Sequence, residues 1–191
     1  MLKLFFSGAM LLLIHTVNAQ IQIGIKAGVN VSNFTGDNFD GFESDPLTSP
    51  HGGVFLRWSF GSHLALQPEV LFSVQGAKIT DPTTSMEEDF KASYVNIPIL
   101  LQYHFNGGLY IEGGPQVGFK VDEDLPGVPD DVLESNDVAL ALGFGYQLKG
   151  GLGIGARYTM GMSSIGKDAD EDTKNGVWQF SLSYTFFNKG K

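Results

Sequence analysis

Five charged residues stand out because each is surrounded by small, apolar or amide side chains. They are Lys26, Arg57, Glu69, Glu112 and Arg157. Carboxylates and cations on one protein face can relay protons or guide ions, or they can neutralise one another as ion pairs. Because an isolated buried charge is very costly, pairing is expected wherever the surroundings exclude water. We interpret these five residues as a structural charge network, with an ion or proton path as the alternative.

Histidines and acids could in principle support hydrolysis. His51, His63 and His104 are available, but no serine, histidine and acid occur together at a recognisable catalytic spacing. The sequence therefore predicts no catalytic residues and no enzyme activity. An enzyme whose active site lies on loops is kept as the third functional alternative.

Two motifs suggest metal or cofactor binding and lack the context that such sites need. The segment from Asp168 to Asp172 alternates oxygen ligands like a calcium loop, without the sixth-position glycine or the closing glutamate. We interpret it as a solvated acidic loop, with a cation site as the alternative. The segment from Gly151 to Ala156 spells a dinucleotide-binding pattern, but no helix pattern follows it. With no cysteine in the chain, thiolate sites are excluded, and we predict no cofactor and no metal.

Composition and charge limit the class of protein and its partners. The 191 residues are 42% hydrophobic and 12% aromatic, which is too apolar for a disordered chain. The net charge of −9 argues against a nucleic-acid partner, since binding to phosphates needs a basic surface. Lys3, an apolar stretch to Ile14 and the sequence Val17-Asn18-Ala19 are typical of a signal peptide. We expect residues 1–19 to be cleaved, leaving a single domain over residues 20–191.

The remaining chain alternates apolar and polar residues with a period of two. This pattern predicts β-strands with one apolar and one polar face. It occurs eight times, at 21–32, 54–60, 64–75, 95–105, 109–119, 138–148, 152–160 and 178–186. No segment shows a convincing helical period. The protein is therefore expected to be all-β, with eight strands.

The connections between these strands alternate between short and long. Short glycine-containing turns at 61–62, 106–108 and 149–151 are typical of hairpins, whereas the other connections are expected at 35–51, 76–91, 120–136 and 163–176. All acidic residues except Glu69 and Glu112 are assigned to the four long loops. This asymmetry predicts an antiparallel up-and-down transmembrane β-barrel, with short periplasmic turns and four long acidic external loops.

A soluble lipocalin-like barrel would show the same alternation with its faces exchanged. The polar face here is mostly Gly, Ser, Asn and Gln, which suits the crowded interior of an eight-stranded barrel better than a water-exposed surface. The five charges would then point into the barrel. Neighbouring strands place Arg57 beside Glu69, and Glu112 is left to Arg157 or Lys26.

Short segments in nearly every predicted strand match one known family in order and spacing, at 24–30, 66–71, 75–78, 94–100, 112–118, 143–146, 156–158 and 182–186. Through them the sequence resembles the PorT-type outer-membrane β-barrel family of Gram-negative bacteria. The resemblance implies an eight-stranded porin-like barrel in the cell envelope, with no enzymatic residues. Pro68, Pro98 and Pro115 fall in these strands, and we expect β-bulges there because proline cannot donate to a strand ladder.

These observations predict a non-enzymatic integral outer-membrane protein with a structural or surface-interaction role. Its expected partners are outer-membrane lipid and, through the acidic loops, other envelope proteins or surface ligands. A narrow channel or a secretion-associated transport component is the main alternative.

Overall fold

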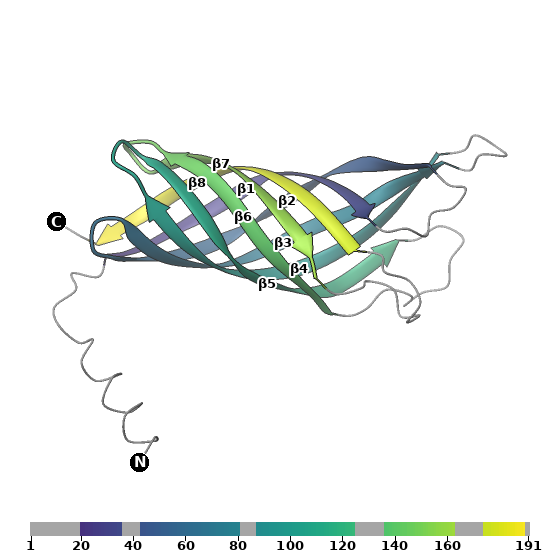
Figure 1. Cartoon of the computed structure of the whole chain (residues 1–191), viewed down its shortest axis with the longest axis horizontal. Helices are drawn as coiled ribbons and strands as arrows, with labels where there is room; N and C mark the ends of the chain where they lie inside the picture. Colours follow the sequence, from purple (N-terminus) through teal and green to yellow (C-terminus); the bar gives the residue numbers. More distant parts are fainter. Residues whose placement is uncertain (1–19, 36–42, 81–86, 125–135, 163–173, 190–191) are drawn as a thin grey trace, which may run out of the picture.

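The computed structural model describes residues 20–35, 43–80, 87–124, 136–162 and 174–189, which form eight antiparallel strands closed into a barrel (Figure 1). The strands are β1 (Gln20–Thr35), β2 (Glu43–Phe60), β3 (Leu64–Thr80), β4 (Glu87–His104), β5 (Leu109–Asp124), β6 (Asn136–Gln147), β7 (Leu152–Gly161) and β8 (Lys174–Lys189). Each strand pairs with the next, and β8 pairs with β1 to complete the ring. The predicted fold class is confirmed. Within the described ranges, no helix is long and apolar enough to cross a membrane.

The period of two directs the apolar side chains to the outside of the barrel. On β6, Leu140 is 37% exposed, whereas its neighbours Ala139 and Ala141 are 1% and 0% exposed. On β7, Ile154 is 48% exposed while Arg157 is 4% exposed. The outer surface is therefore apolar, as lipid requires, and the interior holds mostly polar or small side chains together with a few large ones such as Leu71 and Leu100.

The three tight hairpins depend on glycine. Gly61, Gly107 and Gly150 have φ angles of 74°, 99° and 103°, a region that side chains with a Cβ rarely adopt. These turns lie at the same end of the barrel as the start of β1 and the end of β8, where Ile21 is paired with Lys189 (Figure 1). We call this end the short-turn end.

Four strands extend at one end at least five residues farther than the alternation predicts. β2 already begins at Glu43, β3 continues to Thr80, β4 begins at Glu87 and β5 ends at Asp124, so the predicted loops are shorter than expected. Several acids that we assigned to loops therefore lie on strands. Asp137 is a clearer correction, because it is on β6 and only 6% exposed. The apolar–polar alternation is lost in these strand extensions, because backbone pairing can continue where neither face of the strand needs to be apolar.

The predicted bulges at Pro68, Pro98 and Pro115 are wrong. The β3–β4 ladder stops at Pro68, opposite Ile99, and resumes at Leu71 in the same register. The β4–β5 ladder likewise resumes unchanged after Pro98, and Pro115 is paired with Leu140 in an unshifted ladder. The missing proline N–H removes local pairing but requires no inserted residue. Register shifts occur instead at Ile23/Gly24, Pro46/His51 and Ser93/Tyr94.

Glycine also makes room inside the barrel for large side chains. A Cβ on Gly145 would overlap the ring of Tyr110, and one on Gly24 would overlap the ring of Phe55. Tyr110 and Phe55 are 5% and 2% exposed, so both rings lie in the interior. The inward-facing glycines thus allow side chains from other strands to fill the lumen.

Candidate functional site

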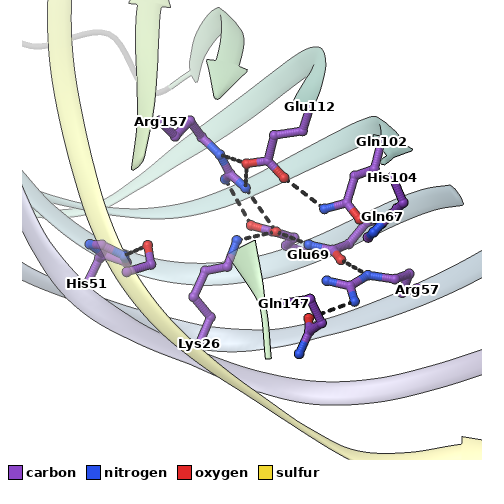
Figure 2. A network of polar contacts seen from close by, with 11 residues as sticks. Lys26, His51, Arg57, Gln67, Glu69, Gln102, His104, Glu112, Gln147 and Arg157 are labelled. Atoms are coloured by element: carbon purple, nitrogen blue, oxygen red, sulfur yellow. Dashed lines mark hydrogen bonds and ion pairs between the residues drawn. The ribbon is translucent and has the colours of Figure 1, made fainter. Parts of the chain in front are cut away.

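Glu69 is at the centre of the buried charges (Figure 2). Its Oε1 lies 2.5 Å from Lys26 Nζ, and its Oε2 lies 2.9 Å from Nη1 of Arg157. Nη2 of Arg157 also donates to Glu69 Oε1 at 3.0 Å, so this contact is bidentate. Glu69 is 1% exposed. A carboxylate with two cationic partners and charge-assisted hydrogen bonds satisfies the requirement for burying charge.

Arg157 links Glu69 to the second carboxylate. Its Nε donates to Oε1 of Glu112 at 2.8 Å, and its Nη2 lies 2.7 Å from the same oxygen. The sequence analysis left Arg157 and Lys26 as possible partners of Glu112, and the residue in contact with it is Arg157. The four residues Lys26, Glu69, Glu112 and Arg157 come from β1, β3, β5 and β7, so the ion pairs join alternate strands.

Glycines on the intervening strands make these cross-strand pairs geometrically feasible. In the register, Gly143 of β6 lies between Glu112 of β5 and Arg157 of β7. A Cβ on Gly143 would lie 3.1 Å from Cβ of Arg157, closer than side chains normally approach. On the other side of the barrel, Gly53 of β2 is opposite Lys26. A larger side chain at Gly143 would compete with the arginine for the same space.

Glutamines complete the network around both carboxylates. Gln67 Nε2 donates to Glu69 Oε1 at 2.7 Å, and Gln102 Nε2 donates to Glu112 Oε2 at 2.8 Å. We did not assign these two residues to the network from the sequence. Both glutamines lie on the polar faces of predicted strands, as the charges do. Gln67 is two residues from Glu69, a spacing that places both side chains on one face and could have assigned Gln67 to the network.

Arg57 does not form the ion pair that we expected with Glu69. Its Nε donates to Gln67 Oε1 at 2.6 Å, and its Nη1 donates to Gln147 Oε1 at 3.0 Å and to Gln22 Oε1 at 3.4 Å. The register explains the difference, because Phe55 is the residue opposite Glu69 and Arg57 falls opposite Gln67. The guanidinium also lies over the rings of Phe55 and Tyr110, at 5.3 Å and 6.0 Å. Gln67 therefore connects Arg57 to the cluster.

The three histidines do not come together. His51 Nε2 is 2.9 Å from Ser181 Oγ, His104 Nε2 is 3.0 Å from Gln102 Oε1, and His63 stacks on Tyr103 at 5.6 Å. Across the described residues, no group of three or more His, Asp or Glu could hold a metal ion. The acidic segment from Asp168 to Asp172 lies outside the described residues.

Several solved structures have the same fold at low sequence identity. Neisserial surface protein A matches with a TM-score of 0.57 at 12% identity, covering 86% of this chain and 97% of its own. The outer membrane protein OprG from Pseudomonas aeruginosa matches with a TM-score of 0.52 at 17% identity, covering 90% and 97%. Ail, the attachment invasion locus protein of Yersinia pestis, crystallised with the heparin analogue sucrose octasulfate, matches with a TM-score of 0.50 at 18% identity, covering 88% and 99%. At these identities the likeness concerns the fold alone.

A family model supplies the assignment that structural likeness cannot. No curated protein sequence matches the chain. The model described as "Outer membrane protein beta-barrel domain" matches residues 17–166, which is well over half of the chain. The chain therefore belongs to the outer membrane protein β-barrel domain family and is an integral protein of the outer membrane.

Proposed function

We propose that this protein is a non-enzymatic outer-membrane barrel whose interior is closed to ions and which serves a structural or surface-interaction role. The observation that carries the proposal is the ion-pair network across the lumen. Lys26, Glu69, Glu112 and Arg157 are all 8% exposed or less, and they join four strands across the interior. An ion crossing the barrel would have to break these contacts.

The free space beside the network supports the same conclusion. The cavity lined by Lys26, Tyr110, Glu112 and Arg157 has a volume of about 10 Å³. A single water molecule needs roughly 10–15 Å³ of such volume. Even one water barely fits, so a hydrated ion does not fit without rearrangement.

Planar-bilayer recording of the refolded protein tests this proposal. We expect no single-channel steps above the bare membrane, while an open porin recorded in the same bilayers gives clear steps. The heat-dependent shift in electrophoretic mobility that folded barrels show would verify that the sample is folded. Ion-selective steps from folded protein would overturn the closed-lumen proposal and establish the narrow channel instead.

Export and orientation are part of the proposal. We infer that residues 1–19 are a signal peptide removed after Ala19, and that the short-turn end faces the periplasm. The acidic segments between the strands would then face outward, available to envelope proteins or surface ligands. The resemblance to the PorT-type family is consistent with this arrangement.

Orientation can be tested with an epitope tag inserted near Pro126, outside the described residues, or at Gly107 in a short turn. Antibody should label the first tag on intact cells and the second only after permeabilisation. Labelling of the Gly107 tag alone on intact cells would reverse the orientation.

A further inference from the structure

Arg57 is the one cation of the network without a carboxylate among the described residues. The network has three cations and two carboxylates, and both carboxylates are bound by Lys26 and Arg157. Arg57 contacts amide oxygens instead, although its side chain is only 4% exposed. The five residues thus carry one excess positive charge, located on Arg57. A buried charge of this kind gains strongly from a counter-ion.

Arg57 lies in the wall of a polar vestibule at the short-turn end of the barrel. This vestibule has a volume of about 670 Å³ and is also lined by Gln22, Gln147, His63, His104 and Lys149. Its described lining contains no acidic side chain. No carboxylate of the described lining therefore repels an anion that enters from this end or competes with it for Arg57.

The guanidinium keeps hydrogen-bonding capacity toward this space. Nε and Nη1 donate to glutamine oxygens, whereas no described residue accepts a hydrogen bond from Nη2. Arg57 is itself one of the residues that line the vestibule. The N–H donors of Nη2 are therefore the ones that can bind the oxygens of a phosphate group.

We propose that the vestibule binds a phosphate group on Arg57, with Lys149 adding attraction from the rim. The site is separate from the ion pairs that close the lumen, so it does not depend on whether the barrel conducts. A phosphate-bearing solute and a phospholipid headgroup share the chemistry that this site recognises. In either case the phosphate oxygens supply the negative charge that the five-residue network lacks.

Binding can be measured on the refolded full chain in a neutral, phosphate-free maltoside detergent. Sodium chloride is exchanged for inorganic phosphate at constant ionic strength, and the NMR signal of the Arg57 Nε–H group is followed. We expect a saturable shift with phosphate. A response no larger than that to chloride would reflect charge screening alone and would exclude a free phosphate ligand, leaving the lipid headgroup as the remaining source.

Gln147→Glu is the most informative variant. It places a carboxylate where the amide oxygen lies 3.0 Å from Arg57 Nη1, so the protein supplies its own anion. Phosphate binding should weaken by at least about tenfold, equivalent to about 1.4 kcal/mol. The barrel should remain folded because the new carboxylate pairs with a buried cation. Arg57→Gln should also abolish binding, but it removes buried hydrogen bonds and is the less secure variant.

Asn136→Glu is the matched control. It adds the same charge on an exposed position at the start of β6, at the end of the barrel away from the short turns. Phosphate binding should be unchanged in this variant. Equal affinity in Gln147→Glu and Asn136→Glu would overturn the site on Arg57.

Two further samples identify the source of the phosphate group. In one, inorganic phosphate is titrated without lipid, and in the other the barrel is placed in nanodiscs that contain phosphatidylglycerol. A shift with inorganic phosphate supports a soluble ligand, and a shift that requires the nanodisc lipid supports a headgroup. The absence of a shift in both samples would overturn the proposal.

Discussion

The barrel interior has two regions that bury polar groups in different ways. The charged region contains Lys26, Arg57, Glu69, Glu112 and Arg157. A neutral region lies farther from the short turns on β1, β3, β5, β7 and β8. It consists of Asn30, Ser73, Gln116, Thr159 and Gln179. In the neutral region Asn30 Nδ2 donates to Ser73 Oγ at 2.9 Å, and Gln179 Nε2 donates to Asn30 Oδ1 at 3.1 Å.

The two regions differ in how completely their polar atoms are satisfied. Among the described residues, the fully enclosed side-chain atoms without a partner include Gln116 Oε1 and Thr159 Oγ1, and none belongs to the five charged residues. A buried charge without a partner costs several kcal/mol, whereas a neutral group costs about 1–3 kcal/mol. The comparison teaches that the enclosed polar atoms of the charged side chains all need a hydrogen-bond or ion-pair partner, whereas the neutral region tolerates atoms without one.

The largest effect is expected from Glu69→Gln. The substitution keeps the side-chain shape but leaves Lys26 without a carboxylate and Arg157 with only Glu112. We expect the free energy of unfolding to fall by about 3–5 kcal/mol, measured by denaturant titration of refolded protein. A loss below about 1 kcal/mol would mean that the charged region behaves like the neutral one.

A smaller effect is expected in the coupling between partners. In a double-mutant cycle, Glu69→Gln and Arg157→Gln should show a coupling energy of about 1–3 kcal/mol, because the side chains form a bidentate contact. The cycle of Glu69→Gln with Arg57→Gln is the matched comparison. It should show a clearly smaller value, because Gln67 lies between those two side chains. Equal coupling in both cycles would contradict this arrangement.

The sequence predicts which face each side chain occupies better than it predicts which residue it meets. Alternation placed all five charges inside the barrel, because a period of two determines the face on which a side chain lies. The partner of Arg57 depends on the register, and a shift of two residues replaces Glu69 with Gln67. The residue types in a tight turn do not by themselves determine the register between the two strands that it joins.

Two other features, one in the site and one at the start of β6, could be recognised only in the folded chain. Arg157 reaches Glu112 because Gly143 lies between them on another strand, and glycine was treated in the sequence only as a small polar-face residue. Asp137 was assigned to a loop because the apolar alternation starts at Val138, although backbone pairing begins earlier and turns Asp137 inward. The extent of hydrogen bonding beyond the apolar band is set by pairing between strands and not by the pattern within one strand.

Ser73→Ala in the neutral region is expected to change the free energy of unfolding less than the substitutions in the charged region. Ser73 is 0% exposed, and its hydroxyl accepts hydrogen bonds from Asn30 Nδ2 and Gln75 Nε2. Asn30 keeps a second acceptor, the carbonyl of Val74 at 2.7 Å. We therefore expect the free energy of unfolding to fall by about 1 kcal/mol in the same titration. A loss as large as that of Glu69→Gln would remove the distinction between the regions.

The smallest effect is expected for Thr159→Val. Thr159 is 4% exposed, and its Oγ1 is enclosed without a hydrogen-bond partner among the described residues. Valine has nearly the same shape, so the substitution removes a desolvated hydroxyl without opening a cavity or leaving another group unpaired. Replacing such a group by an apolar one is close to neutral or stabilising, so the free energy of unfolding should stay the same or rise by up to about 1 kcal/mol. Ser73→Ala serves as the control, since it removes a hydroxyl that does have partners. If Thr159→Val lowers stability as much as Ser73→Ala, the hydroxyl has a partner in solution, and the neutral region is satisfied as fully as the charged one.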